Sequence, residues 1–288
     1  MTAAASFQFK KRINLISGKG GVGRSTLAAS LARASAAQGK KTLLVDMEDD
    51  SGWASPFAAY FSASILASEK NLSVLSLSAR HGQEKFLHEF LKIPGLTQLI
   101  LSNQGVKWFL EGAPAFKEMG FFYHFLLLLR EDYEVVVLDL PATGHFMGLV
   151  QLPALLLKMI PFGPIAERLK EGQGYLFNPE MTDTWVVTLP QTLPVSEAIE
   201  LKQALQKEKL PLGGFILNRA PSPVLTQQEL QLLNAFTGTA EPWLEKNRSF
   251  SAAQQRLSAE ALPLWIAPET LQPVAETDFV SKMKAHPV

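Results

Sequence analysis

The sequence predicts an α/β protein built as a three-layer sandwich, with a mostly parallel sheet of about seven strands between helical layers and an additional helical insert. Short apolar segments rich in β-branched residues alternate with helical segments along the chain, which is the order that βαβ units produce. These apolar segments are continuous, as expected of strands that are covered on both faces. The predicted strands cover residues 12–17, 41–46, 72–77, 134–140, 184–189, 213–220 and 262–267.

Helical segments join the predicted strands and carry local start and stop signals. Residues 23–41 are rich in alanine and leucine, and Gly39 is a residue type that commonly ends helices. Residues 193–210 are amphipathic. A third helix is expected to begin near Thr226, which has Glu229 three residues later, the spacing of a capping box. All three are interpreted as helices that cover the sheet.

Two stretches are less regular, and ligand- or partner-specific structure is expected in such places. Residues 51–131 contain helical segments at 81–92 and 117–129 and are predicted to face a partner. Residues 153–182 hold three prolines within their first dozen positions and are predicted to be a loose connection. Since there is no internal repeat or low-complexity tract, we expect a single domain over residues 1–288.

The composition excludes several kinds of function. Lys plus Arg and Asp plus Glu both total 27, so there is no basic field for nucleic acid. The absence of cysteine excludes disulfides, thiolate metal sites and cysteine nucleophiles. The N-terminal segment lacks the apolar core of a secretion signal. The apolar run at 120–129 is about half a membrane span and is interpreted as a buried helix, with a client-binding or membrane-surface helix as the alternative. We expect a cytoplasmic protein with no nucleic-acid partner and no stable membrane insertion.

A glycine-rich segment, SGKGGVGRST at residues 17–26, lies between a predicted strand and a predicted helix. Gly18, Gly23 and Ser25 have the spacing of the phosphate-binding loop G-x-x-x-x-G-K-[ST], but Arg24 stands where that pattern has lysine. Glycines allow successive backbone N–H groups to turn toward a polyphosphate, and the helix N-terminus adds a favourable dipole. A plain glycine turn is the alternative. The residues predicted to contact ATP or ADP in this loop are Gly18, Lys19, Gly20, Gly21, Val22, Gly23, Arg24, Ser25 and Thr26.

Acidic residues at the ends of two predicted strands indicate a Mg²⁺ site in a P-loop NTPase fold. Asp139 ends a buried strand, where a carboxylate can hold a Mg²⁺-bound water; a cap for the next turn is the alternative. The segment DMEDD at 46–50 places four acids within five residues, which repel one another unless a cation or solvent intervenes. The predicted metal ligands are Ser25, Asp46 and Asp139.

Several of these segments resemble the deviant P-loop ATPase class that includes ArsA, the tail-anchored-protein targeting ATPases, MinD and ParA. Because MinD and ParA lack the P-A-T-G-H form, the resemblance is to the ArsA-like ATPases of this class. GKGGVGRST looks like the deviant loop K-G-G-V-G-K-[ST], in which the lysine matching Lys19 reaches across a homodimer to the partner's ATP. A solvated Lys19 is the alternative. DLPATGH within residues 135–153 resembles the ArsA-type switch segment, and GAPAFKEMG resembles the P-G-x-x-E-[LA] segment with Ala115 in the glycine position. Residues 187–220 resemble the following strand, helix and strand, where the asparagine matching Asn218 reads the adenine. A turn residue is the alternative for Asn218.

The resemblance also implies how water is placed for hydrolysis. Glu48 matches the water-activating aspartate of the family, and Asp46 matches the Mg²⁺-linked one. Asp49 replaces a proline, so the role could pass to Asp49 or be lost. Gly144 and His145 are expected to shape the switch loop, with a catalytic imidazole as the alternative. The implied catalytic residues are therefore Glu48, Asp46 and Lys19.

Two functions remain open at this point. The first is a homodimeric Mg²⁺·ATP hydrolase in which motion at 46–55 and 139–148 reshapes residues 51–131 to grip or release a protein partner. The second is a nucleotide-sensing binding module with little hydrolysis, because Arg24 is bulkier than lysine and DMEDD departs from the family pattern. A small-molecule kinase is disfavoured since no acceptor-binding motif is visible. Without cysteine, neither a thiol-based arsenite site nor a zinc-bridged dimer is possible.

Overall fold

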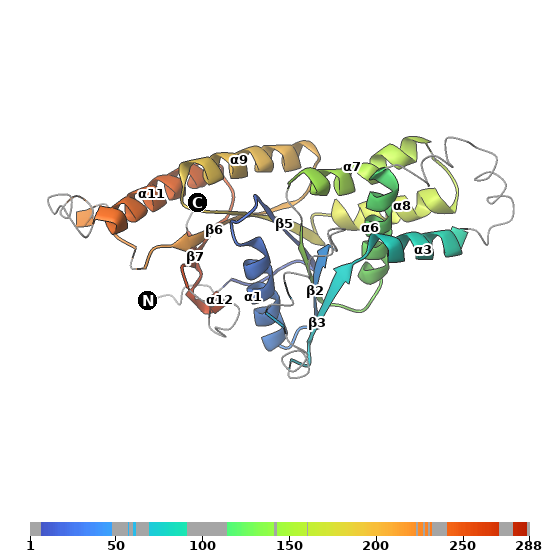
Figure 1. Cartoon of the computed structure of the whole chain (residues 1–288), viewed down its shortest axis with the longest axis horizontal. Coiled ribbons are helices and arrows are strands. Elements are labelled where there is room, and N and C mark those ends of the chain that lie inside the picture. Colours follow the sequence, from blue (N-terminus) through green and yellow to red (C-terminus); the bar gives the residue numbers. More distant parts are fainter. Residues whose placement is uncertain are drawn as a thin grey trace.

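A single eight-stranded sheet organises the protein (Figure 1). The computed structural model describes residues 7–47, 57, 60–61, 69–90, 114–140, 143–159, 161–222, 224–226, 228–229, 231, 241–270 and 279–286. The strands are β1 (Ile13–Gly18), β2 (Thr42–Met47), β3 (Leu72–Leu77), β4 (Val135–Asp139), β5 (Thr182–Thr188), β6 (Leu212–Ala220), β7 (Leu264–Pro268) and β8 (Lys284–His286).

The spatial order of the strands is β3-β2-β4-β1-β5-β6-β7-β8. All neighbouring pairs are parallel except β7 with β8. The seven predicted strands are confirmed. The short β8 is an additional edge strand, and its sequence KAH lacks the apolar pattern on which the prediction rested. The parallel order places the carboxyl ends of β1, β2 and β4 at one edge of the sheet.

Helices cover both faces of the sheet, which gives the predicted three layers (Figure 1). On one face, α1 (Arg24–Ala37) and α12 (Phe279–Lys282) pack against side chains such as Ile16 of β1. On the other face, Ile13 and Leu15 of the same strand face a second core, because successive side chains point to opposite faces. The helices that contribute to this second core are α3 (Ala79–Phe90), α6 (Pro114–Leu129), α7 (Thr143–Met159), α8 (Pro164–Leu176), α9 (Thr192–Lys207) and α11 (Glu241–Ser258).

The local helix signals in the sequence are confirmed where the structure describes them. Helix α1 ends at Ala37, and Gly39 adopts φ +90° just beyond it. The Thr226 N–H donates to Glu229 Oε2 at 2.8 Å, and the Glu229 N–H donates to Thr226 Oγ1 at 3.3 Å, the two contacts of a capping box. The apolar run at 120–129 is a buried part of α6, as predicted.

The prediction of a loose connection over residues 153–182 is wrong. Helix α7 continues through Pro153 to Met159, and α8 begins at Pro164 directly after Gly163. Leu152 and Leu156 are buried in the core, and this burial outweighs the backbone hydrogen bond that Pro153 cannot make. Pro164 starts a helix well because its fixed φ suits the first helical position. Among the described residues, none of the helices is long and apolar enough to cross a membrane.

Candidate functional site

The glycine-rich segment connects β1 to α1 at the carboxyl-end edge of the sheet, as predicted. Gly18 has φ +152°, and a Cβ at this position would lie 2.5 Å from the carbonyl oxygen of Val187 in β5. Gly23 has φ +90°, and a Cβ there would lie 2.4 Å from Nδ2 of Asn218 in β6. Neither position accepts a larger residue without movement of its neighbours, so the spacing of these two glycines reflects how the loop packs on β5 and β6.

The N-terminus of α1 is suited to binding an anion. Gly23 is the N-cap residue and provides no side-chain cap, and the first turn contains no acidic residue. The first N–H groups of a helix have no acceptor within that helix, and the helix dipole favours negative charge at this end. A phosphate group would meet both requirements. Arg24, Ser25 and Thr26 form this first turn.

Ser25 and Asp139 meet at this end of the sheet. Ser25 Oγ donates a hydrogen bond to Asp139 Oδ2, which lies at the end of β4. Asp139 is buried, and its Oδ1 has no hydrogen-bond partner among the described residues. Asp46 is also buried, near the end of the neighbouring β2. The three predicted metal ligands therefore come from elements that converge at one edge.

The charge state of Asp139 reflects this environment. The pKa of Asp139 is raised to about 6, mainly by burial and to a smaller extent by repulsion from Asp46. The hydrogen bond from Ser25 and the charge of Arg24 act in the opposite direction. A buried carboxylate oxygen without a partner and a second nearby carboxylate are both features that a bound cation would satisfy.

These oxygen donors suit Mg²⁺ better than a metal ion whose ligands all come from protein side chains. No group of three or more His, Cys, Asp or Glu side chains suited to a metal occurs in the part of the chain that the structure describes. Mg²⁺ typically uses one or two carboxylates and takes its remaining ligands from phosphates and water. Ser25, Asp46 and Asp139 could hold Mg²⁺ in that way.

Arg24 extends from the phosphate loop to the end of β4. Its guanidinium donates a hydrogen bond to the backbone carbonyl oxygen of Leu140, the residue after Asp139. Burial lowers the pKa of Arg24, and the nearby carboxylate of Asp139 partly opposes that effect. Arg24 thus links the loop to the main chain at the start of the predicted switch segment, a contact that the sequence pattern did not reveal.

Lys19 is half-exposed and forms an ion pair with Glu197 of α9, with 3.2 Å between Nζ and Oε1. Nothing in the sequence of α9 marks Glu197, among the acids of that helix, as a partner of the loop. Lys19 is therefore held within its own chain in this structure.

Two other polar contacts brace the loop and α1. Asn218 donates from Nδ2 to the carbonyl oxygen of Val22 at 2.9 Å. Thr26 Oγ1 and the hydroxyl of Tyr60 are 2.9 Å apart. Tyr60 comes from the segment between β2 and β3, and no sequence motif identified it as part of this site.

Some predicted site residues cannot be located. Glu48 and Asp49 lie outside the described residues, as do residues 141–142 of the DLPATGH segment. The remainder of the predicted switch loop is helical, because α7 begins at Thr143 and includes Gly144 and His145. Gly144 and His145, which are expected to shape the switch loop, therefore stand in the first turn of α7. Ala115 lies in the first turn of α6.

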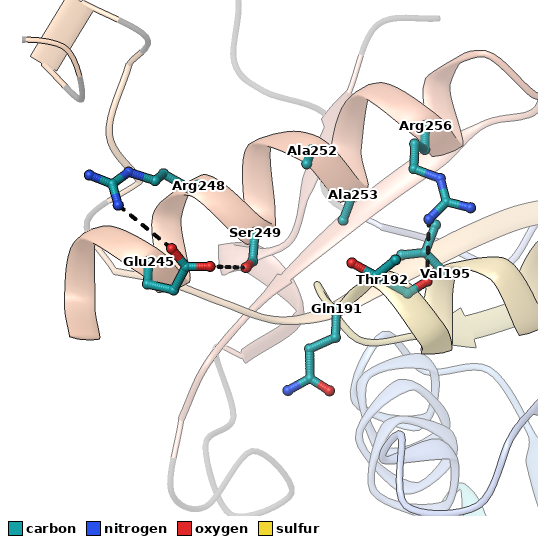
Figure 2. A pocket seen from close by; sticks show the side chains of 9 residues that line it. All are labelled: Gln191, Thr192, Val195, Glu245, Arg248, Ser249, Ala252, Ala253 and Arg256. Atoms are coloured by element: carbon teal, nitrogen blue, oxygen red, sulfur yellow. Dashed lines mark hydrogen bonds and ion pairs between the residues drawn. The ribbon is translucent and has the colours of Figure 1, made fainter. Parts of the chain in front are cut away.

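A separate cavity of about 310 Å³ lies between α9 and α11 (Figure 2). It is lined by Gln191, Thr192, Val195, Glu245, Arg248, Ser249, Ala252, Ala253 and Arg256. Arg248 is paired with Glu245, and Arg256 donates to the carbonyl oxygen of Thr192, as Figure 2 shows. None of the predicted site residues lines this cavity, so it is distinct from the phosphate loop.

The parallel sheet, the glycine loop between β1 and α1, and the Ser25–Asp139 contact define the P-loop NTPase class. Within that class, residues 11–163 match the anion-transporting ATPase (ArsA ATPase) family. The match covers more than half of the chain, and the protein belongs to this family.

Individual relatives agree with that assignment. ATPase BagA of Mycobacterium tuberculosis is 28% identical over 232 residues, which cover 76% of this chain and 68% of BagA. An arsenical pump-driving ATPase of Escherichia coli is 28% identical over 233 residues, covering 75% of this chain but only 37% of the relative. ATPase GET3B of Arabidopsis thaliana is 24% identical over 268 residues, covering 74% of this chain and 65% of GET3B.

Proposed function

We propose that the protein is a homodimeric, Mg²⁺-dependent ATPase that uses nucleotide-driven switching to control a protein partner. The observation that carries this proposal is the contact between Ser25 and Asp139, whose buried Oδ1 has no partner in the part of the chain that the structure describes. This contact lies next to the N-terminus of α1, which has no side-chain cap. A cation held at the contact would therefore lie beside a polyphosphate bound at the helix N-terminus. Membership of the anion-transporting ATPase family supports the same conclusion.

In the proposed mechanism the loop binds the phosphates through backbone N–H groups, and Arg24 contributes a permanent positive charge. The Ser25 hydroxyl and the carboxylates of Asp139 and Asp46 would hold Mg²⁺ directly or through water. Bound Mg²⁺ would offset the negative charge that spreads over the phosphate oxygens during transfer. Thr26 is proposed to bond a phosphate nearer the base, beside Tyr60.

Positioning of the attacking water is assigned to the acids at the end of β2 and just after it. Glu48 is the proposed water-positioning residue, with Asp46 and Asp49 as the alternatives. The buried position of Asp46 near the end of β2 supports a role for this strand end in the site. Phosphoryl transfer depends mainly on positioning and charge stabilisation, so a displaced acid would slow hydrolysis more than it weakens binding.

Lys19 is proposed to reach across the homodimer to the ATP of the partner. In the single chain it pairs with Glu197, and the Lys19 side chain is 45% exposed. Ion pairs this exposed contribute at most about 1 kcal/mol, so the pair can separate at small cost when the dimer closes.

The alternative is a nucleotide-sensing module that hydrolyses ATP slowly or not at all. The specific observation in its favour is the hydrogen bond from Arg24 to Leu140. An arginine that donates to the main chain at the start of the switch segment has less freedom to follow the phosphates as they separate.

The protein partner is proposed to contact the region over residues 51–131 and the helices next to it. On the neighbouring α7 and the turn that follows it, Leu155 is 53% exposed and Phe162 is 84% exposed, which supports a contact surface nearby. A cytoplasmic location is part of this proposal. Because the chain has no cysteine, a thiol-based arsenite site is not part of it.

The proposal is tested by measuring ATP binding and phosphate release by the purified protein, with and without Mg²⁺, over a range of protein concentrations and with candidate partners. We expect Mg²⁺-dependent hydrolysis that Ser25→Ala lowers by about 100-fold or more. Ser30→Ala is the matched control, because Ser30 lies on the same helix and its hydroxyl donates to the carbonyl oxygen of Thr26. ATP binding without hydrolysis under every condition would support the sensing module, and absence of ATP binding would reject both functions.

A further inference from the structure

Strand β6 is irregular at its carboxyl end. Its register against β7 shifts between Leu217 and Ala220, and Arg219 adopts φ +57° in the left-handed region. A residue other than glycine rarely adopts this conformation, and bulges of this kind often redirect a side chain next to a functional site. The residue that precedes Arg219 in this bulge is Asn218.

Both ends of the Asn218 amide are engaged. Oδ1 accepts the N–H of Arg219 at 2.9 Å, which supports the left-handed turn, and Nδ2 donates to the Val22 carbonyl oxygen at 2.9 Å. The side chain is buried. Because a buried amide with two such bonds is fixed in orientation, the bulge in β6 is tied to the phosphate loop 196 residues earlier in the chain.

The contact with Val22 also fixes the direction of one loop N–H. In a planar trans peptide, the carbonyl oxygen of Val22 and the N–H of Gly23 point in opposite directions. Since the oxygen points at Asn218, the Gly23 N–H must point away from β6. The absence of a Cβ on Gly23 makes this arrangement possible, because that atom would lie 2.4 Å from Asn218 Nδ2.

We propose that Asn218 is a positioning residue for the phosphate loop, which holds the Val22–Gly23 peptide in the orientation that binds phosphate. This inference rests on the proposed nucleotide site, and it differs from reading the adenine base. A base-reading residue affects only ligands that carry a base. A residue that orients the loop affects every polyphosphate, including one with no base.

The test compares Mg²⁺·ATP with Mg²⁺·tripolyphosphate, which has no base or sugar, by calorimetric titration of the full chain. We expect Asn218→Ala to weaken the binding of both ligands by about 5-fold, the loss that one neutral hydrogen bond corresponds to. Asn218→Leu preserves the side-chain volume without the donor, and it should give the same result if the alanine variant folds poorly.

Asn247→Ala is the matched control. Asn247 is also buried, and its amide also makes two backbone hydrogen bonds, to the Leu225 N–H and the Trp243 carbonyl, but it lies on α11. This variant should lower thermal stability while leaving the affinity for both ligands unchanged.

The outcomes separate the inference from the function on which it rests. Weakened ATP binding with unchanged tripolyphosphate binding would overturn the positioning role and leave base reading. An equal loss in Asn247→Ala would also overturn it, because the effect would then be general destabilisation. Failure of the unmodified protein to bind ATP would instead reject the proposed function.

Discussion

Two clusters of polar residues in this protein differ in how completely their side chains are hydrogen-bonded. At the phosphate loop, Asp139 is 6% exposed and retains a buried oxygen without a partner among the described residues. Between α3, α6 and α8, a network of half-exposed side chains is fully paired: Arg130 donates to both oxygens of Glu171 at 2.9 and 2.6 Å, and Arg168 donates to Glu89 at 2.8 Å. The paired network stabilises the fold by itself, whereas in the described part of the chain Asp139 accepts a hydrogen bond from Ser25 at Oδ2 and none at the buried Oδ1.

The pKa shifts in the two clusters have opposite directions. Burial raises the pKa of Asp139 to about 6, so ionisation of this residue opposes folding. The hydrogen bonds from Arg130 chiefly lower the pKa of Glu171, so its ionisation favours folding. A carboxylate whose ionisation opposes folding and an ion-pair network that joins helices can therefore be told apart by how the stability of each responds to pH.

The largest expected effect is at Asp139. Between its unfolded pKa of about 3.8 and its folded pKa of about 6, the folded state binds more protons, so the free energy of unfolding falls as pH rises. Asp139→Asn removes this dependence. Without Mg²⁺ or nucleotide, the variant should be more stable than the original protein at pH 7, by on the order of 3 kcal/mol, with no difference below about pH 4.

Urea unfolding across this pH range measures the effect. Asp132→Asn, at an exposed carboxylate, is the control and should change nothing. An Asp139→Asn variant that is less stable than the original protein at pH 7, with the difference vanishing in acid, would show that the Asp139 carboxylate is stabilised by its surroundings, as that of Glu171 is, and would remove the contrast between the clusters.

A smaller effect is expected at Arg24, which belongs to the phosphate-loop cluster but is engaged by Leu140. Arg24→Lys replaces a forked cation with a compact one that can approach both phosphates. We expect the single-turnover hydrolysis rate to rise by about tenfold, a change of about 1.4 kcal/mol in the barrier, with ATP affinity within a few-fold. An unchanged slow rate would mean that Arg24 is not what limits hydrolysis. Arg33→Lys, on the same helix and paired with Glu69, is the control.

The smallest effect is expected in the paired network. Glu171→Gln should lower the free energy of unfolding at pH 7 by about 1 kcal/mol, because partly exposed ion pairs contribute little. A lowered carboxylate pKa contributes stability above the unfolded value and loses it as pH falls through the folded value, so this difference should vanish in acid. Nucleotide binding should not change.

Chemical unfolding together with an ATP titration checks this variant. Glu84→Gln in the more exposed Arg80–Glu84 pair of α3 is the control, with no measurable loss expected. Weaker ATP binding in Glu171→Gln would show that the network takes part in the site and does not only join helices.

Much of the architecture could be predicted because it depends on local patterns. Continuous apolar segments identified all seven predicted strands, since a strand covered on both faces needs apolar residues on both faces. The prediction for residues 153–182 is wrong because it follows from the prolines, whereas α7 continues through Pro153 and buries Leu152 and Leu156. Proline is a local signal, but the burial that outweighs it depends on where the helix packs.

Within the site, the sequence by itself determined the glycine loop, the ends of β2 and β4 that carry Asp46 and Asp139, and hence a place where Ser25 could meet a carboxylate. Spacing alone carries that information, because parallel strands end at a common edge. Only the tertiary structure decided that Arg24 bonds to Leu140, that Lys19 pairs with Glu197, and that Asn218 orients the Val22 peptide. These contacts join residues more than a hundred positions apart, and their geometry is fixed by packing and a single bulge, which no local pattern records.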